Sequence, residues 1–273
     1  MAGKFRDEVA VITGGGSGIG RALGEALASR GARVVLADLN AEAAERVADQ
    51  IRKVGGRARA VGLDVTDAEA VRDLARQVSA DHGCVGYWFN NAGVNVVAEL
   101  RDTTLEDWNL LIDVNLRGVI HGIQAVYPLM IEQHYGHIIN TASLAGLVPA
   151  PMEGAYAATK HAVVGLSTTL RAEARALGVR VSVVCPGVVR TPMIDTGKYV
   201  RVRKEDMIRL LIERPFGVDA AAEAILTGVA RNRAIITVTR TTPLLWWLYR
   251  LIPDAGVRLA AEFVGRARRH REP

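Results

Sequence analysis

Cysteine is scarce in this sequence: of 273 residues, only Cys84 and Cys185 are cysteines. They form no Cys-x-x-Cys pair, and neither stands at metal-ligand spacing from a histidine. These absences argue against a disulfide framework and against a zinc site. The six histidines form no His-x-x-x-His pair either, so we expect no metal centre.

Long hydrophobic runs are also lacking. No uninterrupted apolar stretch reaches the roughly 18 residues that a membrane-spanning helix needs. The first residues, Met-Ala-Gly-Lys-Phe-Arg-Asp-Glu, lead straight into an apolar strand pattern without a hydrophobic signal region. No stripe of lysine and arginine interleaved with aromatics, of the kind that binds nucleic acid, runs through the chain. We therefore expect a cytoplasmic protein that binds no nucleic acid.

Charge of one sign gathers only at the C-terminal end. The formal net charge is +5, and residues 241–273, with six arginines against three acidic residues, carry +3 of it. The rest of the chain is nearly balanced. Hydrophobic residues make up 49% of the sequence and charged residues 23%, which are ordinary values for a folded domain.

Short β-branched runs alternate with helical patterns along the chain. Such βαβ units build a parallel sheet with helices on both faces, because right-handed crossovers must pack over the sheet. The seven predicted strands are Val9–Thr13, Arg33–Leu39, Ala58–Val65, Tyr87–Phe89, His137–Thr141, Val179–Cys185 and Ile235–Thr239. They predict a Rossmann-like, doubly wound α/β fold of three layers over residues 1–240, with a helical extension at 241–273.

A glycine-rich turn joins the first predicted strand to a helix-forming stretch, Arg21–Arg30. Glycines let the backbone approach a pyrophosphate closely, and the helix N-terminus beyond offers free N–H groups. The spacing Gly-x-x-x-Gly-x-Gly differs from the commoner Gly-x-Gly-x-x-Gly, and a tight loop without a ligand is the alternative. The residues expected to contact a dinucleotide are Gly14, Ser17, Gly18, Ile19 and Gly20.

Asp38 ends the second predicted strand, 18 residues past Gly20. An acidic side chain there accepts hydrogen bonds from the adenosine ribose hydroxyls, and its charge repels a 2′-phosphate. This predicts NAD as the cofactor, in preference to NADP. The alternative is an aspartate that caps a helix at Asp38-Leu39-Asn40.

Together, several motifs resemble those of the short-chain dehydrogenase/reductase family over roughly residues 7–240. Each motif is common by chance, whereas the whole set in this order is highly specific. The set comprises the Thr13–Gly20 loop, Asp64-Val65, Asn90-Asn91-Ala92-Gly93, Asn115, Ser143, Tyr156-x-x-x-Lys160, Pro186-Gly187 and Thr191. The resemblance implies an oxidoreductase that moves a hydride between nicotinamide and a carbonyl or alcohol carbon.

The resemblance also implies cofactor contacts beyond the glycine loop. Asp64 and Val65, closing the third strand, would hold the adenine, and the Asn91-Ala92-Gly93 turn would pack against the riboses. After the sixth strand, the implied cofactor residues are Pro186, Gly187, Val189 and Thr191. Taken alone, Asp64 looks like part of a helix start and Asn90–Gly93 like an ordinary turn.

Tyr156 and Lys160 are the predicted chemical centre, because positions i and i+4 lie side by side on a helix. A neighbouring ammonium lowers the pKa of a tyrosine from its usual value near 10 by roughly 1–3 units. Tyr156 would then be the general acid for ketone reduction and the general base for alcohol oxidation. For this pair alone, a surface aromatic beside a surface lysine is the simpler interpretation.

The resemblance adds three roles around this pair. Lys160 would also bond the nicotinamide ribose and so serve in cofactor binding, as would Tyr156 beside it. Ser143, ending the fifth strand, would hold the substrate oxygen and stabilise the charge that develops on it. Asn115, inside the helical segment Leu105–Gln133, would anchor a water in a proton relay behind Lys160. The alternative is that Asn115 caps or kinks a turn.

The loops that flank this site are mostly apolar, which favours a lipophilic secondary alcohol or ketone. Sugar, steroid, retinoid and fatty-acyl substrates all stay open. The basic segment Lys198–Arg209 allows a second hypothesis, an NADP-dependent ketoreductase of carrier-linked acyl groups, although a solvated helix face explains it more simply. A third hypothesis is a non-catalytic nucleotide sensor, which the intact Ser143, Tyr156 and Lys160 oppose.

The extension at 241–273 predicts two short amphipathic helices interrupted at Pro253. The apolar repeats are Leu244, Trp247, Leu248 and Leu251, then Val257, Ala260, Ala261 and Val264. We expect the extension either to cover its own domain or a partner subunit beside the substrate entrance, or to lie peripherally on an anionic membrane. It replaces the Gly-rich strand that ends many family members, so we expect a homodimer through the helices of Asn115 and Tyr156 in preference to a tetramer.

Overall fold

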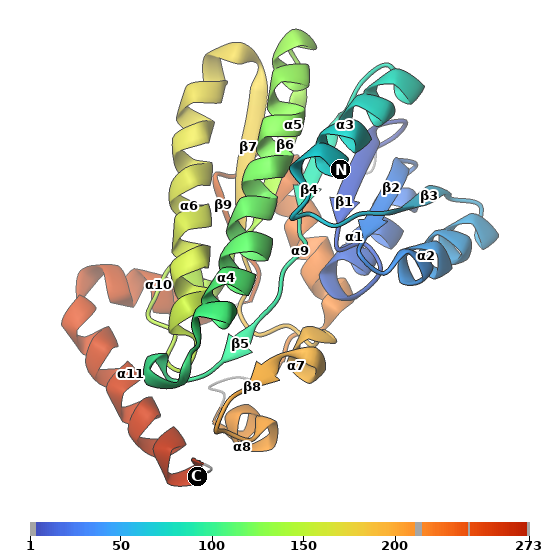
Figure 1. Cartoon of the computed structure of the whole chain (residues 1–273). Coiled ribbons are helices and arrows are strands. Elements are labelled where there is room, and N and C mark those ends of the chain that lie inside the picture. Colours follow the sequence, from blue (N-terminus) through green and yellow to red (C-terminus); the bar gives the residue numbers. More distant parts are fainter. Residues whose placement is uncertain (1–3, 211–214, 240, 272–273) are drawn as a thin grey trace.

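The computed structural model describes residues 4–210, 215–239 and 241–271. Its centre is a sheet of seven parallel strands in the order β3-β2-β1-β4-β6-β7-β9 (Figure 1). The strands are β1 Val9–Thr13, β2 Arg33–Asp38, β3 Arg57–Gly62, β4 Tyr87–Asn90, β6 Gly136–Thr141, β7 Val179–Cys185 and β9 Ile235–Thr237. The predicted doubly wound sheet is confirmed. Its strand order reverses between β1 and β4, and open α/β sheets bind ligands at such a point, beyond the carboxyl ends of the strands.

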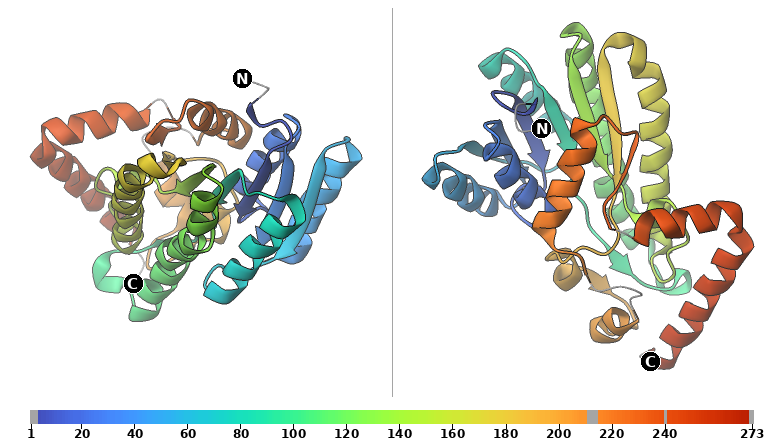
Figure 2. Two further views of the ribbon diagram at one scale, coloured as in Figure 1. Left: turned by 90° about the horizontal axis from the view of Figure 1, so that it is seen from above. Right: turned by 180° about the vertical axis from the view of Figure 1, so that it is seen from behind.

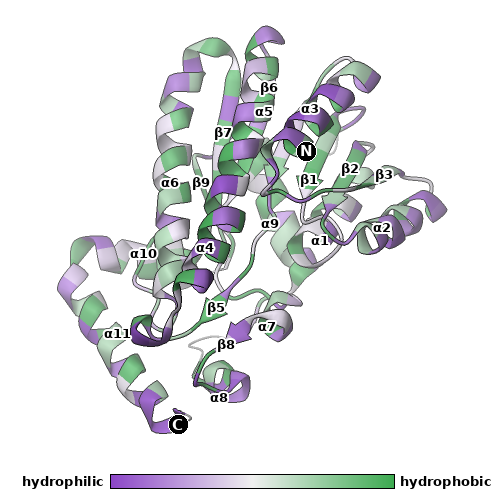
Figure 3. Cartoon of the chain, viewed as in Figure 1, coloured by the Kyte–Doolittle hydropathy of each residue, from purple (hydrophilic) through white to green (hydrophobic). Residues whose placement is uncertain are grey.

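Helices cover both faces of the sheet and complete the three layers (Figure 2). One face carries α1 (Gly18–Ala28), α2 (Ala41–Lys53) and α9 (Val218–Ala230), and the other carries α3 (Ala68–His82), α5 (Gly118–Glu132) and α6 (Gly154–Ala174). Successive side chains of a strand point to opposite faces, so Trp88 and Phe89 of β4 enter different cores. Figure 3 shows the resulting contrast between hydrophobic strands and the hydrophilic outer side of α2.

The predicted helical segment Leu105–Gln133 is interrupted in its middle. The structure has α4 (Leu105–Ile112), then a π-helical turn over Asp113–Arg117, and then α5. Single π-helical turns inside helices are frequent at functional sites. Asn115 lies in this turn and is fully buried, so the segment is helical without being one regular α-helix.

Several predicted strand ends are wrong. Strand β2 ends at Asp38 and not at Leu39, β4 ends at Asn90 and not at Phe89, and β9 ends at Thr237 and not at Thr239. Asp64 and Val65 follow β3, which ends at Gly62, and do not close it. The Asp64 carboxylate accepts hydrogen bonds from the N–H and hydroxyl of Thr66 at 2.9 and 2.8 Å, and this turns the chain towards α3. Ser143 likewise lies past β6, where it caps a short 3₁₀ turn instead of continuing the strand.

Small elements lie beyond the carboxyl edge of the main sheet. Strands β5 (Val96–Val97) and β8 (Lys198–Tyr199) form a second, two-stranded parallel sheet. The short helices α7 (Met193–Thr196) and α8 (Lys204–Arg209) flank β8. Elements this short carry no detectable periodicity, which explains why the sequence pattern does not predict them.

Two helices follow the last strand, α10 (Thr241–Leu251) and α11 (Pro253–Ala267), with a 3₁₀ turn at Arg268–His270. Figure 2 shows them as a bent arm along one side of the domain. Their interruption at Pro253 agrees with the prediction. No helix in the described ranges combines the length and hydropathy needed to cross a membrane.

The two sides of α10 differ in how deeply they are buried. Leu244, Trp247 and Leu251 are 56%, 59% and 58% exposed. Trp246, on the other side of the helix, packs against the core beneath α3, α5 and α6. Since both sides of this helix are apolar, the spacing of its hydrophobic residues does not decide which side is buried.

Candidate active site

The glycine loop is folded so tightly that larger side chains would not fit. Gly14 has φ +65°, and a Cβ added there would lie 2.9 Å from Ala92 Cα. A Cβ at Gly20 would lie 2.0 Å from the Gly14 carbonyl oxygen, so α1 begins directly against the turn. Ser17 caps α1 without a side-chain hydrogen bond to it, which leaves its hydroxyl and the first-turn N–H groups available to an anion. This cradle fits a dinucleotide pyrophosphate.

Asp38 borders the glycine loop. Its two carboxylate oxygens accept hydrogen bonds from the N–H groups of Gly16 and Asn40, each at 2.9 Å. The carboxylate is thereby fixed at the loop, and its other lone pairs remain acceptors for hydroxyl donors. The helix-capping alternative is wrong, because the cap of α2 is Asn40, which accepts from the Ala43 N–H at 2.9 Å.

Thr13 ties the Asn91-Ala92-Gly93 turn to the glycine loop. Its hydroxyl accepts from the N–H groups of Asn91 and Ala92 at 3.0 and 3.1 Å, and Asn91 Nδ2 donates to the Thr13 carbonyl at 3.0 Å. A Cβ added at Gly93 would lie 3.6 Å from Lys160 Nζ. The turn therefore joins the nucleotide loop to the predicted chemical centre.

Asp64 and Val65 lie at the same edge of the sheet as Asp38. The Leu63 N–H donates to the Asp38 carbonyl at 2.8 Å, which holds the two strand ends together. Val65 packs against Gly118 of α5, and its carbonyl is 2.9 Å from His121 Nδ1. A role of this turn at the adenine stays a prediction.

The segment after β7 returns to the glycine loop. A Cβ added at Gly18 would lie 3.2 Å from Thr191 Cγ2, so Thr191 borders the first turn of α1. The Pro186 carbonyl accepts from the Leu144 N–H at 2.7 Å, and a Cβ at Gly187 would lie 2.6 Å from Thr239 Oγ1. Val189 forms an isolated bridge with Phe216. The implied cofactor residues of this segment thus run between Ser143 and α1.

Tyr156 and Lys160 lie side by side on α6. Lys160 Nζ is 5.4 Å from the centre of the Tyr156 ring and donates to the Thr141 carbonyl at 3.0 Å. Tyr156 is 9% exposed and Lys160 is 3% exposed. The interpretation of this pair as a surface aromatic beside a surface lysine is therefore wrong.

The pKa of Tyr156 is shifted in the direction opposite to the predicted one. Burial raises the pKa of Tyr156 well above its usual value, the charge of Glu153 raises it further, and the hydrogen bond with Ser143 opposes both. Burial also lowers the pKa of Lys160 to about 8. The predicted lowering of the Tyr156 pKa by Lys160 is wrong, because desolvation of the phenolate is the largest cause of the shift and Lys160 is not among its causes.

Ser143 faces the Tyr156 hydroxyl from the start of the 3₁₀ turn Leu144–Gly146. Its own hydroxyl accepts from the Ala145 N–H at 3.1 Å, which orients it. Nearby Cys185 is fully buried, and burial raises the pKa of its thiol to about 12, so it is no nucleophile. Across the described ranges, no three His, Cys, Asp or Glu side chains gather as a metal site.

The side-chain amide of Asn115 forms hydrogen bonds with the loop after β4. Its Oδ1 accepts from the Val94 N–H and its Nδ2 donates to the Val94 carbonyl, both at 2.9 Å. These bonds hold the loop against the π-helical turn. A water held by Asn115 stays a prediction, and these two bonds occupy one donor and one acceptor of the amide.

A polar pair near Tyr156 is not part of the motifs. Asn95 Nδ2 donates to Glu153 Oε1, and Asn95 Oδ1 is buried without a hydrogen-bond partner among the described residues. Burial raises the pKa of Glu153, and the bond from Asn95 opposes this shift. The sequence did hold a signal, since Glu153 is the one charged residue between Ala142 and Thr159.

The glycine loop, the half-buried Ser143 and the buried Tyr156 and Lys160 meet at one edge of a doubly wound sheet, which defines the dinucleotide-binding class of α/β proteins. Within that class, residues 8–198 match the family model described as short chain dehydrogenase. The chain belongs to this family, the short-chain dehydrogenases/reductases, as the motifs predict.

Curated relatives are oxidoreductases by name. A probable oxidoreductase, EphD, of Mycobacterium tuberculosis is 34% identical over 263 residues, which cover 93% of this chain and 44% of that protein. This chain thus spans less than half the length of that relative. The cyclohexanol dehydrogenase of Acinetobacter sp. is 37% identical over 195 residues, or 71% of this chain and 78% of that protein.

Solved structures share the fold. A short-chain dehydrogenase/reductase from Burkholderia phymatum in complex with NAD superposes with a TM-score of 0.84 at 33% identity, covering 92% of this chain and 96% of that one. A metagenomic short-chain oxidoreductase in complex with NADP has a TM-score of 0.65 at 38% identity, covering 68% and 85% of the two chains. Relatives of this fold therefore occur with either nicotinamide cofactor.

Proposed function

We propose that this protein is an oxidoreductase that transfers a hydride between NAD(H) and the carbon of a secondary alcohol or ketone, with Tyr156 as general acid and base. The observation that carries the proposal is the buried Lys160 5.4 Å from the Tyr156 ring, with Ser143 at the Tyr156 hydroxyl. Burying an ammonium that is not paired with a carboxylate costs free energy, so a role in the chemistry explains why it is there. A non-catalytic nucleotide sensor has no need of this group.

The side chains divide the chemistry among them. In ketone reduction, the Tyr156 hydroxyl gives its proton to the substrate oxygen while the Ser143 hydroxyl donates a hydrogen bond to the same oxygen. Lys160, whose pKa burial lowers to about 8, can supply a proton near working pH. The bound nicotinamide supplies or accepts the hydride. Since burial keeps Tyr156 protonated, we expect reduction to be favoured at neutral pH and oxidation to rise with pH.

The preference for NAD rests on Asp38. Its carboxylate is fixed by the Gly16 and Asn40 N–H groups, so it cannot easily turn away from a 2′-phosphate. One similar structure is in complex with NAD and another with NADP, so the fold does not decide between the two cofactors. The proposed preference for NAD therefore depends on Asp38. NADP is the alternative cofactor.

A lipophilic substrate is favoured over a carrier-linked one. The basic residues expected to receive carrier phosphates are engaged by carboxylates. Lys198 pairs with Asp107 at 2.7 Å and Lys204 with Asp195 at 3.0 Å. A free anion would have to compete with these pairs, which weakens the alternative of a carrier-dependent ketoreductase.

Two surface contacts are part of the proposal. Leu105 and Leu110 of α4 are 76% and 45% exposed, which supports a homodimer through α4, α5 and α6, measurable by light scattering. The exposed Trp247 and Leu251 lie on the same helix as exposed Arg250, which supports peripheral contact with an anionic membrane. Co-sedimentation with anionic vesicles at low and high salt tests this contact, and absence from the pellet under both conditions rejects it.

A spectrophotometric screen tests the function itself. Secondary alcohols and ketones are offered with NAD(H) and NADP(H) in parallel, and the change in nicotinamide absorbance is followed. We expect turnover of apolar secondary alcohols or their ketones with NAD(H). Turnover with none of them would contradict the proposed function.

A further inference from the structure

An apolar cavity of about 370 Å³ lies between the C-terminal arm and the loops after β6 and β7. This volume falls within the roughly 300–1,000 Å³ of small-ligand pockets. The residues that define its two sides are Leu144, Val148 and Val188 on the domain and Leu245, Tyr249 and Phe263 on the arm. None of these side chains carries a charge, so the cavity offers little to a polar ligand.

The domain side of the cavity includes residues that are next in sequence to residues of the candidate active site. Leu144 directly follows Ser143, and its N–H donates to the Pro186 carbonyl at 2.7 Å. Val188 directly follows Gly187, in the segment that returns to the glycine loop. The backbone segments that carry Ser143 and Gly187 therefore also carry the domain wall of the cavity.

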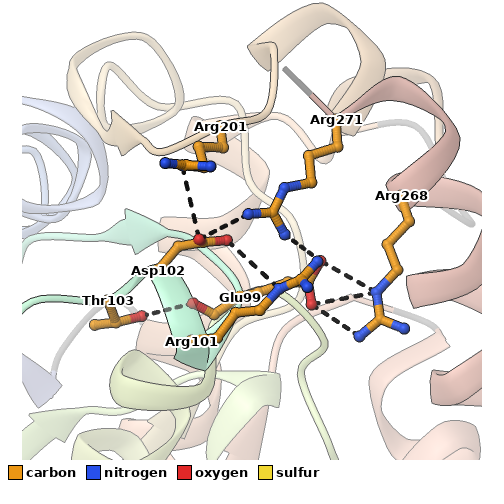
Figure 4. Close-up of polar contacts among 7 residues, drawn as sticks. All are labelled: Glu99, Arg101, Asp102, Thr103, Arg201, Arg268 and Arg271. Carbon is orange, nitrogen blue, oxygen red and sulfur yellow. Dashed lines mark hydrogen bonds and ion pairs between the residues drawn. The ribbon is translucent and has the colours of Figure 1, made fainter. Parts of the chain in front are cut away.

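The arm side of the cavity is tied to the domain by a cluster of charges, shown in Figure 4. Arg268 bonds Glu99 at 2.8 Å and Arg271 bonds Asp102 at 2.8 Å. The Glu99 and Asp102 side chains are only 9% and 11% exposed, so these pairs are partly shielded from solvent. Arg201 also reaches Asp102, which connects the arm to the segment around β8.

Apolar contacts also hold the end of α11 on the domain, next to the charged cluster of Glu99, Asp102, Arg268 and Arg271. Ala267, at the end of α11, is buried in a small cluster with Val97 and Met152, and Phe263 packs against it. The arm is thus held at both ends, by α10 on the main core and by the end of α11 on the loops of the site. Its position over the cavity is a fixed part of the fold.

We propose that this cavity binds the hydrocarbon part of the substrate, and that the C-terminal arm is the element that selects substrates by apolar size. The inference rests on the proposed function for the identity of the ligand as a substrate. The occupant is the apolar chain or ring attached to the reacting alcohol or ketone carbon. The arm supplies the outer wall, and Leu144 and Val188 connect that wall to Ser143.

A series of 2-alkanols from 2-butanol to 2-octanol tests the selection by size on the intact chain. We expect kcat/KM to rise about fourfold per added methylene, the equivalent of ~0.8 kcal/mol per buried CH₂. In Ala260→Trp, which fills the cavity, the rise should be lost while 2-butanol is affected little. Ala261→Trp is the matched control, because Ala261 is exposed on the same helix and does not line the cavity.

A binding measurement separates this inference from the proposed function. N-phenyl-1-naphthylamine, an uncharged apolar fluorophore, should bind the intact chain and lose at least about tenfold in affinity in Ala260→Trp. Val148→Phe, which fills the cavity from the domain side, should weaken binding in the same way if Ala260→Trp fails to fold. Binding of the probe as expected, without turnover of any secondary alcohol or ketone in the screen, would contradict the proposed function and still support the apolar site. Equal effects of Ala260→Trp and Ala261→Trp on the probe and on the alkanol series would overturn the inference.

Discussion

Lys160 donates a hydrogen bond to the carbonyl of Thr141 at 3.0 Å, where β6 ends. The bond anchors an ammonium inside the sheet edge and sets it 5.4 Å from the Tyr156 ring. Only 3% of Lys160 is exposed, and no carboxylate is among the groups that shift its pKa. Such a charge costs stability, so its position is explained by chemistry and not by folding.

Lys160→Met should therefore stabilise the fold. Burial lowers the pKa of this lysine from 10.5 to about 8, a cost on the order of 3 kcal/mol. The cost is complete below about pH 8 and disappears as the pH rises towards 10.5, because the unfolded chain then binds more protons than the native one. Urea unfolding of both proteins should show a gain near neutral pH that shrinks by about pH 10. A gain that grows with pH would contradict this.

Lys160→Ala should impair function twice. The side chain is predicted to bond the nicotinamide ribose and to support Tyr156, so the affinity for NAD and the turnover should fall together. Calorimetric titration of NAD and steady-state kinetics measure the two effects separately. Loss of turnover with unchanged affinity for NAD would remove the cofactor role.

Asp38→Ser should move the cofactor preference towards NADP. The substitution removes a charge that repels a 2′-phosphate and weakens the bonds to the ribose, each on the order of 1–3 kcal/mol, or about 5–150-fold. The ratio of kcat/KM for NAD and NADP reports the change. Glu42→Ser, which removes a 92% exposed carboxylate of α2, is the control and should leave the ratio unchanged. A wild type that already prefers NADP would show that Asp38 was misinterpreted.

Glu99→Gln should loosen the C-terminal arm. Hydrogen bonds from Arg268 and Arg101 lower the pKa of Glu99, so the charged form stabilises the native arm. Because the pKa of Glu99 is lowered from its ordinary value of 4.5, the carboxylate stabilises the native protein above pH 4.5. This contribution is lost as the pH falls from 4.5 through the lowered pKa. Amide exchange over 253–267 should accelerate in Glu99→Gln at neutral pH, and in the wild type on acidification. Glu262→Gln, at an exposed position of α11, should exchange like the wild type, and equal protection in all three proteins would contradict the tethering role.

Much of the fold is encoded in local patterns. The strands follow from runs such as Val9–Thr13, all five of whose residues are buried, and the nucleotide loop follows from glycines placed between a strand and a helix. Tyr156 and Lys160 needed only their spacing to be placed together. These features depend on neighbours in the sequence, which is why they could be predicted.

Other features depend on contacts between distant segments. Asn95 donates a hydrogen bond to Glu153 from another loop. The isolated charge of Glu153 is visible in the sequence, but no local pattern predicts that Asn95 is its partner. The direction of the Tyr156 pKa shift is decided by burial, which the sequence does not display. The side of α10 that packs on the domain could not be predicted, because apolar residues occur on both sides of this helix. Only the surrounding fold determines that Trp246 turns inward and Trp247 outward.

Tyr156→Phe tests whether Tyr156 is the general acid and base of the reaction. The ring and its packing remain, so the affinity for NAD should stay within about twofold, while turnover of the best alcohol or ketone should fall by roughly 10²–10⁴. Tyr127→Phe, a tyrosine of α5 outside the site, is the matched control and should retain activity. Stopped-flow absorbance of the nicotinamide under single-turnover conditions measures the chemical step itself. We expect this step to be lost in Tyr156→Phe alone. Turnover within a few-fold of wild type in that variant would contradict the role of Tyr156 as general acid and base.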